Sequence, residues 1–361
     1  MRFDMTNSMS LACCALFLGL SASAPARAEP DVLDRPALMR TEARTTTSVL
    51  LAVHTAGRRI VVAGERGVIL WSDDGASHWQ QARVPVSVTL TGLSFADDKN
   101  GWAIGHSGIV LGTRDGGQSW TKLLDGKQAA DIVVAEAAQP GSSPGFIADA
   151  QRLVADGADK PFLGVHFSDA RNGLVVGAYG LIFSTKDGGA SWTPRQARID
   201  NPKGLHLYAI HATEDTVYVA GEQGALFAAP GLDGDFKALR TPYQGSYFGL
   251  LTAGKALIVF GMRGNAYWSG DKGMTWQRCD IPGTNTLTGG IRLQDGRVVL
   301  VDDGGNVLLS QDDGRRFTRA AMPKTTPLAA VGESADGQLL LAGVRGISAA
   351  PRPQHTKGDT P

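Results

Sequence analysis

The amino-acid sequence predicts an all-β protein, a seven-bladed β-propeller built from four-stranded blades. A turn motif of eight residues, with a hydroxyl, an Asp, a Gly and an aromatic residue in fixed places, recurs five times, with Ala76 in place of the Gly in the first copy. A glycine that follows a β-rich run recurs seven times, and five of the six intervals between these glycines are 40 to 44 residues. The chain holds 46 glycines, which favours tight turns over helices. Repeats of about 41 residues with four strands each are typical of propeller blades.

Each repeat can be divided into four strands. The first strand contains a small residue among apolar ones, such as Gly92, Gly164, Ala209 or Gly249. A small side chain suits the innermost strand, because the blades converge on the axis there. The second strand is the β-rich run, the third leads from the recurring glycine to the hydroxyl of the turn motif, and the fourth begins at the aromatic residue.

The turn motif is expected to connect the third and fourth strands. Its Asp carboxylate can accept backbone N–H bonds, its hydroxyl can brace that carboxylate, and glycine supplies a positive φ. The aromatic side chain is expected to be buried between neighbouring blades. Five copies indicate architecture rather than one catalytic site. The structural residues are Ser72, Asp74 and Trp79; Thr113, Asp115, Gly117 and Trp120; Thr185, Asp187, Gly189 and Trp192; Ser269, Asp271, Gly273 and Trp276; and Ser310, Asp312, Gly314 and Phe317.

Residues 1–28 have the pattern of a signal peptide. Arg2 lies in a short polar start, residues 11–20 form an apolar stretch, and Ala26 and Ala28 are small residues at a cleavage site. The apolar stretch is too short to span a bilayer. The sequence therefore predicts an exported protein.

The three cysteines bear on the same prediction. A lipoprotein anchor at Cys13 or Cys14 is the rival interpretation of the N-terminus, but both residues lie at the start of the apolar stretch rather than after it. Cleavage near residue 28 would leave Cys279 as the lone cysteine. We therefore expect no internal disulfide, and stability must come from burial and hydrogen bonds.

We expect the propeller to span residues 29–351 and residues 352–361 to form a disordered polar tail. The seventh repeat ends without a fourth strand, which would leave a sheet edge unpaired. Residues 36–46 precede the first repeat. We predict that they pair with the last blade as its outer strand and so close the ring.

One interval between the recurring glycines is longer than the others. It measures 72 residues and places an insertion at about residues 124–160, between blades two and three. Two interpretations are open: a helix packed on the propeller's own rim, or a lid that docks a partner. The second half of the insertion carries apolar residues at helical spacing, namely Phe146, Ile147, Ala150, Leu153 and Val154.

The turns between the second and third strands lie on the face opposite the turn motifs, and they carry the candidate binding residues. Arg66, Arg263 and Arg345 occupy the same turn position in three blades, and His106 and Tyr179 lie in the corresponding turns of two others. The arginines are either ordinary solvated charges or a cationic patch for an acidic partner segment. Rigid turns would hold guanidinium groups at fixed spacing for carboxylates.

The sequence offers no support for a nucleic-acid partner or a metal ion. Lys and Arg together number 35, as do Asp and Glu, so no charge surplus favours nucleic acid. His206 and His211 lie five residues apart around one predicted strand, which is a poor spacing for a shared metal ion. We therefore expect no metal, no cofactor, and a monomer when the protein is alone.

Two long phrases combine the turn motif with the glycine pair: "FADDKNGWAIGHSGIVLGTRDGGQSW" and "FSDARNGLVVGAYGLIFSTKDGGASW". The motif resembles the Asp-box, or bacterial-neuraminidase, repeat of sialidases and other propellers. The phrases resemble more narrowly the photosystem II stability and assembly factor family, over about residues 45–350, although residues 229–236 lack the Asp. This resemblance implies an exported seven-bladed propeller in the periplasm or, in a photosynthetic host, the thylakoid lumen.

Two classes of function follow. The resemblance implies a non-enzymatic scaffold for a membrane protein or assembly intermediate, with an envelope transporter as one conceivable client. The alternative is a sialidase-like glycoside hydrolase or a glycan-binding propeller. Such a hydrolase needs three arginines, a tyrosine nucleophile with a glutamate base, and a carboxylic acid. Tyr179 and Glu222 are the nearest match, and the Arg-Ile-Pro signature of sialidases is missing, so we expect no catalysis.

Overall fold

The computed structural model describes residues 31–322 and 326–353. The predicted signal peptide and all but two residues of the predicted tail lie outside these ranges. The described residues belong to a single structural unit.

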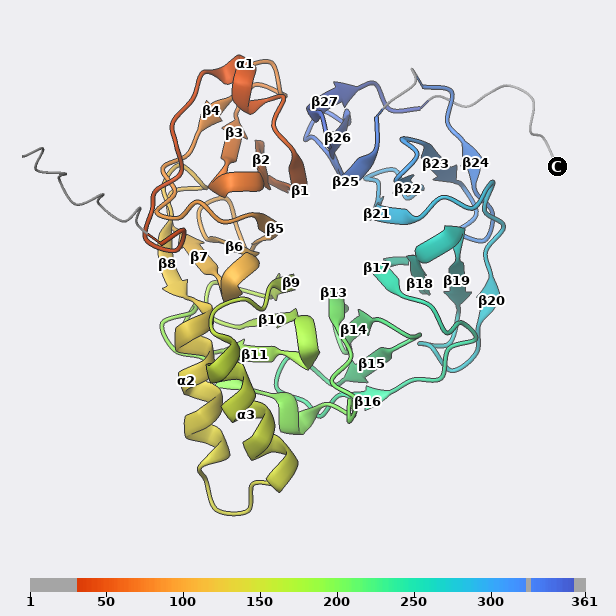
Figure 1. Cartoon of the computed structure of the whole chain (residues 1–361). Coiled ribbons are helices and arrows are strands. Elements are labelled where there is room, and N and C mark those ends of the chain that lie inside the picture. The colour runs from red at the N-terminus through yellow and green to blue at the C-terminus, as the bar shows by residue number, and fades with distance from the viewer. Residues whose placement is uncertain (1–30, 323–325, 354–361) are drawn as a thin grey trace, which may run out of the picture. The chain divides into compact units, whose positions relative to one another are not determined.

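The described residues form seven antiparallel sheets, six of four strands and one of three. Each sheet uses strands that are consecutive in the sequence, so each repeat folds as one blade. The blades follow one another around a central opening (Figure 1). The predicted all-β, seven-bladed propeller is confirmed.

The strand bounds are as follows. Blade one contains β1 (Leu50–Ala56), β2 (Arg59–Gly64), β3 (Ile69–Ser72) and β4 (Gln80–Gln81), and blade two contains β5 (Leu90–Phe95), β6 (Gly101–Gly105), β7 (Val110–Thr113) and β8 (Thr121–Leu124). Blade three contains β9 (Phe162–Phe167), β10 (Gly173–Gly177), β11 (Ile182–Thr185) and β12 (Thr193–Pro194), and blade four contains β13 (Leu207–Ala212), β14 (Val217–Gly221), β15 (Leu226–Ala229) and β16 (Lys237–Ala238). Blade five contains β17 (Tyr247–Ala253), β18 (Ala256–Gly261), β19 (Ala266–Ser269) and β20 (Gln277–Arg278). Blade six contains β21 (Leu287–Arg292), β22 (Val298–Asp302), β23 (Val307–Ser310) and β24 (Thr318–Arg319), and blade seven contains β25 (Leu328–Glu333), β26 (Leu339–Gly343) and β27 (Gly346–Ala350).

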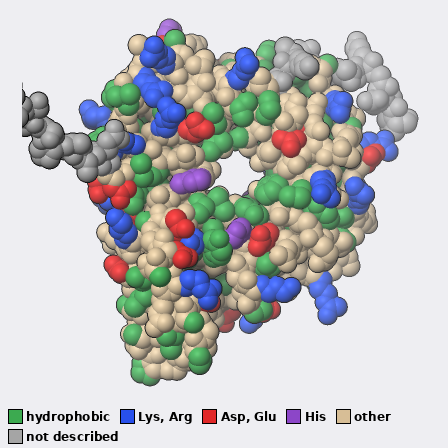
Figure 2. Space-filling model, viewed as in Figure 1, with side chains coloured by type: hydrophobic (Ala, Val, Ile, Leu, Met, Phe, Trp, Pro, Cys, Tyr) green, Lys and Arg blue, Asp and Glu red, His purple; other side chains and the backbone are tan. Residues whose placement is uncertain are grey.

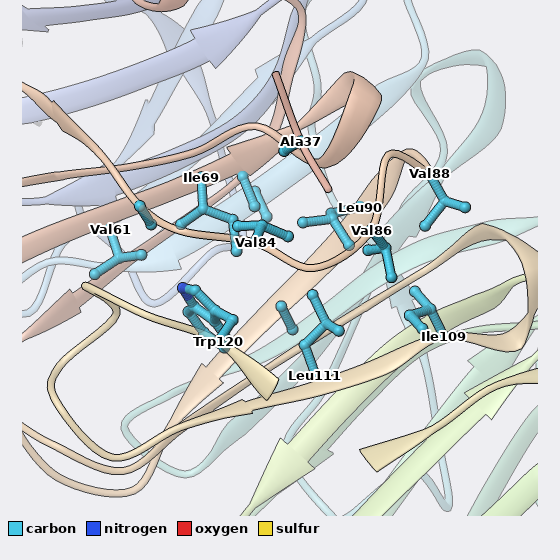
Figure 3. Close-up of a cluster of buried hydrophobic side chains, with 14 of the residues drawn as sticks. Ala37, Val61, Ile69, Val84, Val86, Val88, Leu90, Ile109, Leu111 and Trp120 are labelled. Carbon is cyan, nitrogen blue, oxygen red and sulfur yellow. The ribbon is translucent and has the colours of Figure 1, made fainter. Parts of the chain in front are cut away.

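Neighbouring blades pack face against face. In the apolar cluster between blades one and two, Val61 and Ile69 of the first blade meet Leu90, Leu111 and Trp120 of the second (Figure 3). The second strand of each blade is buried along almost its whole length, because it has a blade on either side. Burial of these β-branched and aromatic side chains is the main source of stability in such a ring.

The small residues of the innermost strands permit this approach. A Cβ atom on Gly164 would lie 3.2 Å from the Cα atom of Ala209 in the next blade. A Cβ atom on Gly249 would lie 2.2 Å from Cζ of Phe260. A larger side chain at Gly164 would push two blades apart, and one at Gly249 would displace Phe260 within its own blade.

The turn motifs are held by a repeated set of hydrogen bonds. The hydroxyl of Thr113 donates to Oδ1 of Asp115 at 2.8 Å and accepts from the N–H of Gly117 at 3.0 Å. Oδ1 of Asp115 also accepts from the N–H of Ser119 at 3.0 Å. The hydroxyl-to-Asp distance is 2.8 Å in all five copies. These side chains brace the turn, as the repeated motif predicts.

Ring closure differs from the prediction. Residues 36–46 do not add an outer strand to blade seven, whose sheet has three strands in the described part of the chain. The segment instead lies along blade one and contains the short helix α1 (Glu42–Thr45). The N–H of Ala37 donates to the carbonyl of Val84 at 3.0 Å, and Oε1 of Glu42 accepts from the N–H of Trp79 at 2.6 Å.

Burial explains why the segment prefers blade one. Leu33 and Ala37 are both buried in the apolar cluster between blades one and two, where Figure 3 shows Ala37. Pairing of the segment with blade seven would take Ala37 away from that cluster. The ring closes by packing β1 against β25 and β26, as at every other junction between blades.

The insertion between β8 and β9 forms two helices, α2 (Gly126–Ala137) and α3 (Pro144–Asp156). Only the second had been predicted, although Asp125 and Gln128 form a capping box that marks the start of α2. Within the predicted stripe, Phe146, Ala150 and Leu153 belong to an apolar cluster that contains residues of α2 and of blades two and three, whereas Ile147 and Val154 are exposed. The hairpin meets the propeller through α2, which contacts β12 and the turn His106–Gly108, while α3 packs on α2.

Candidate functional site

The turns between second and third strands define one face of the ring, called the turn face below. Four of them are short 3₁₀ turns: η1 (Glu65–Gly67), η2 (His106–Gly108), η3 (Ala178–Gly180) and η5 (Met262–Gly264). In all four the middle residue has a positive φ of 55 to 58°, although none of the four is glycine. This sparsely populated conformation indicates that the turns are fixed by their surroundings. The middle residues include Arg66, Tyr179 and Arg263, whose side chains are all exposed.

Arg66 is joined by two arginines that the sequence did not single out. Together they line a cavity of about 310 Å³, formed by Arg40, Arg44, Thr47, Ser48, Val49, Glu65, Arg66 and Val68. Figure 2 shows Lys and Arg side chains gathered in this region, over α1 and blade one. Guanidinium groups that converge on one hollow form a site for carboxylate or phosphate oxygens.

Arg345 lies at the same part of the turn face. Two residues beyond it, the N–H of Ile347 donates to the carbonyl of Thr46 at 3.1 Å, so the blade-seven turn meets the end of α1. Arg40, Arg44, Arg66 and Arg345 are called the basic cluster below. Within the described ranges none of these four arginines forms an ion pair. Three arginines and one carboxylate, Glu65, line the cavity, so the charge around it is positive.

The position of Arg40 follows from contacts that fix the N-terminal segment. The N–H of Arg40 donates to Oε1 of Gln81 at 2.8 Å, and Nε2 of Gln81 donates to the carbonyl of Leu38 at 3.0 Å. Arg44 is in the last turn of α1, where a cation is favoured by the helix dipole. Sequence reasoning missed both arginines because it assigned their segment to blade seven.

The remaining predicted residues lie elsewhere on the turn face. His106 is exposed beside α2, and Arg263 in blade five is exposed and has no described contact with the basic cluster. Tyr179 is 62% exposed. Its N–H donates to Nδ1 of His206 at 2.8 Å, and Nζ of Lys160 lies 5.0 Å from the centre of its ring. The five predicted residues thus share a face, but the structure joins only Arg66 and Arg345 through one segment.

The geometry does not assemble the sialidase arrangement. No hydrogen bond joins Tyr179 to Glu222 in the described structure. Glu222 instead affects Tyr208: burial is the larger cause that raises the pKa of Tyr208, and the charge of Glu222 raises it further. Among residues 31–322 and 326–353, no group of three or more His, Cys, Asp or Glu could hold a metal ion. Tyr179 and Glu222 are therefore not joined as the nucleophile and base of a sialidase would be.

Three half-buried histidines, His54, His166 and His211, lie at equivalent positions of the inner strands β1, β9 and β13. Each is paired with the residue three positions before the glycine that ends the second strand. Burial lowers the pKa of His54 and of His211 to about 4, and the charge of His166 adds to the effect at His211. Burial also lowers the pKa of His166 itself. All three imidazoles are therefore neutral near pH 7.

Among the helices of the described residues, none is long and apolar enough to cross a membrane.

A relative of the chain is the photosystem II assembly lipoprotein Ycf48 of Synechococcus sp. (strain CC9902), which is 26% identical over 187 residues. The match covers 49% of this chain and 54% of that protein, so the chain spans about half the length of this relative.

Two solved structures share the fold. One is YCF48 bound to a D1 peptide, with a TM-score of 0.62, 15% identity, and coverage of 85% of this chain and 94% of that one. The other is streptogramin B lyase, with a TM-score of 0.64, 12% identity, and coverage of 84% and 93%. Since a binding protein and a lyase are both similar, the fold alone does not decide the function.

The family is decided by sequence. A family model described as photosynthesis system II assembly factor YCF48 matches residues 71–154 and 148–343. These ranges contain all the Asp-box turns and most of the blades. The chain therefore belongs to the photosynthesis system II assembly factor YCF48 family.

Proposed function

We propose that this protein is a non-catalytic assembly factor that binds a membrane protein, or an intermediate of a membrane complex, through the turn face. The observation that carries the proposal is the basic cluster, in which arginines from two separate segments converge on a hollow without ion-pair partners. Such a site fits an acidic segment of the client, because guanidinium groups bind carboxylates through paired hydrogen bonds. Complementary charge would also speed the encounter between them.

Family membership supports this proposal. The Synechococcus relative is a photosystem II assembly lipoprotein, and a YCF48 structure of similar fold holds a D1 peptide. Peptide binding by that protein makes a peptide segment a reasonable ligand for this one. The comparisons offer no support for an envelope transporter as the client.

The proposed place of action is the periplasm, or the thylakoid lumen in a photosynthetic host. The signal-peptide pattern of residues 1–28 and the assembly lipoprotein among the relatives both favour export. A soluble propeller in that compartment would meet only the exposed loops and termini of a membrane protein. The acidic segment is therefore expected in such a loop or terminus.

Affinity capture from native membranes tests the proposal. Native membranes are chemically cross-linked with either the tagged wild-type protein or a tagged variant that carries Arg40→Gln, Arg44→Gln and Arg66→Gln. The proteins captured by the two are then compared. We expect one membrane protein to be enriched by the wild type and lost at least tenfold in the variant, because three charge-assisted contacts are removed. Arg263→Gln, tested alone, shows whether the site extends to blade five.

A matched control removes the same charge from the opposite face. Arg58, Lys99 and Arg114 are exposed, lie in turns on the Asp-box side, and can be changed to Gln together. This control should capture the client as well as the wild type does. Equal losses in both triple variants would mean that net charge, rather than the basic cluster, governs binding.

A further inference from the structure

The inner strands share an irregularity close to the turn face. In every blade the register between first and second strands shifts by one residue near the start of the first strand. A bulge of this kind re-aims the extra side chain. The seven extra residues are Leu51, Thr91, Leu163, Tyr208, Phe248, Thr288 and Ala329, and they are called the collar below.

The packing of blade four shows where a collar residue points. Leu207 belongs to the apolar cluster shared with blade three, and Ala209 packs in the cluster shared with blade five. Tyr208, between them, belongs to neither cluster and is partly exposed. The other six collar residues are partly exposed as well. The free edge of the innermost strand faces the axis, so the collar lines the central opening that Figure 2 shows.

The collar carries no charged side chain. The hydroxyl of Thr91 donates to the carbonyl of Phe162 at 2.7 Å, and that of Thr288 donates to the carbonyl of Leu328 at 2.8 Å. Both threonine hydroxyls therefore form hydrogen bonds between neighbouring blades, and only the methyl groups of Thr91 and Thr288 remain to contact a ligand. A wall of this kind offers little to a sugar, whose hydroxyls need partners, and suits an apolar group.

The apolar wall is strongest on blades three to five. The rings of Tyr208 and Phe248 are 5.2 Å apart, and His206 is 6.4 Å from Tyr208. His206 in turn contacts the exposed Tyr179 at 4.7 Å, so aromatic rings continue from the opening onto the turn face. Aromatic side chains that are partly exposed and fixed by their neighbours are typical of binding sites.

The collar adjoins the basic cluster at blade one. Val49 lines the cavity of the basic cluster, and Leu51 of the collar follows two residues later. We propose that the collar receives an apolar side chain, of the size of Phe or Leu, from the same acidic client segment that the basic cluster binds. This inference rests on the proposed function and adds to it a preference for an apolar residue flanked by carboxylates.

Fluorescence anisotropy with two labelled peptides tests the collar. The peptides are Glu-Asp-Phe-Asp-Glu and Glu-Asp-Ser-Asp-Glu, which carry the same charge. We expect the Phe peptide to bind about tenfold more tightly to the wild-type protein, because an aromatic side chain leaves water. Phe248→Ala should remove most of that preference without weakening the Ser peptide, and Leu163→Ala should reduce it by a smaller factor.

Controls separate the two proposals. Met274 is 81% exposed in an Asp-box turn on the opposite face, so Met274→Ala should keep the tenfold preference. Equal binding of both peptides, or a preference that survives both collar variants, overturns the collar and leaves the basic cluster intact. If Arg66→Gln weakens the binding of both peptides but the Phe peptide still binds more tightly than the Ser peptide, both sites are supported. If neither peptide binds the wild type, both proposals are contradicted.

Discussion

The N–H of Ile347 in blade seven donates a hydrogen bond of 3.1 Å to the carbonyl of Thr46, at the end of α1. Gly346 permits this contact, because a Cβ atom there would lie 1.7 Å from the same oxygen. The bond joins the last blade to the segment that precedes the first. It also places Arg345 and Arg44 on either side of one junction, which is how residues about 300 positions apart contribute to the basic cluster.

A first prediction concerns the approach between inner strands. Gly164→Ala should lower the free energy of unfolding by about 1–3 kcal/mol, because the added methyl group meets the neighbouring strand. Its Cβ atom would lie 2.9 Å from Cγ2 of Val176 and 3.2 Å from the carbonyl oxygen of Tyr208. Urea denaturation at neutral pH measures the effect.

Gly145→Ala is the matched control for that substitution. Gly145 lies in the first turn of α3 with nothing within 4 Å of its added Cβ atom. It should leave stability unchanged or raise it by up to about 1 kcal/mol, since alanine is the better helix former. A destabilisation by Gly145→Ala as large as that by Gly164→Ala would show that close packing at the axis is not the cause.

A second prediction concerns the Asp-box turns. Thr185→Val keeps the shape of a buried side chain but removes the hydroxyl that donates to Asp187 and accepts from the N–H of Gly189. Unfolding should become easier by about 1–2 kcal/mol, the usual consequence of leaving a buried donor without a partner. Ser77→Ala removes an exposed hydroxyl that donates to the carbonyl of Asp74 in another copy of the motif, and it should have no comparable effect because water can replace that contact.

The prediction for Thr185 fails if calorimetry gives both variants the wild-type transition. A turn that tolerates the loss of its hydroxyl would depend on its glycines alone. That outcome would also remove the physical reason for finding Ser or Thr at the first position of every copy of the motif.

A third prediction concerns the pH dependence of stability. His54 and His211 have a pKa of about 4 in the folded protein, because burial disfavours their charged form, against an ordinary value of 6.5. Between these values the unfolded chain binds more protons than the folded one, so stability falls as the pH drops from about 6.5 to 4. The double variant His54→Gln and His211→Gln should flatten this part of the profile.

The Asp-box carboxylates titrate in a separate window. Hydrogen bonds from Ser191 lower the pKa of Asp187 to about 2, and those from Thr275 lower the pKa of Asp271 to about 2. The stability that they contribute is present above their unfolded pKa of 3.8 and is lost as the pH falls toward 2. Thermal melts should therefore show two losses, and a single loss below pH 4 would contradict the role of the histidines.

The fold was predictable because its markers are local. The glycine that ends the second strand and the Asp-box turn each depend on a few neighbouring residues, such as Thr113 to Trp120, so their period shows in the sequence. The start of α2 was marked too, by Asp125 and Gln128. The signal there is a capping box with Asp in place of Ser or Thr, which the apolar spacing that predicts α3 does not detect.

The site was only partly predictable, because it depends on contacts between distant segments. Arg66 could be placed on the turn face from blade geometry alone. Arg40 joins it only because Ala37 is buried between blades one and two and Gln81 holds the backbone beside it. The collar was hidden for a related reason, since a bulge at Tyr208 changes the direction of a side chain without changing the apolar pattern.

Site-specific photo-cross-linking in native membranes tests the central claim, that the basic cluster binds an acidic client segment. A photoreactive residue replaces Thr47, which is exposed and lines the cavity of the basic cluster, and Met274 on the opposite face serves as the control position. We predict a light-dependent adduct with one membrane protein from position 47 and none from position 274, with the cross-linked client peptide rich in Asp or Glu. An adduct from position 274 alone, or the same adduct from both positions, would contradict the account.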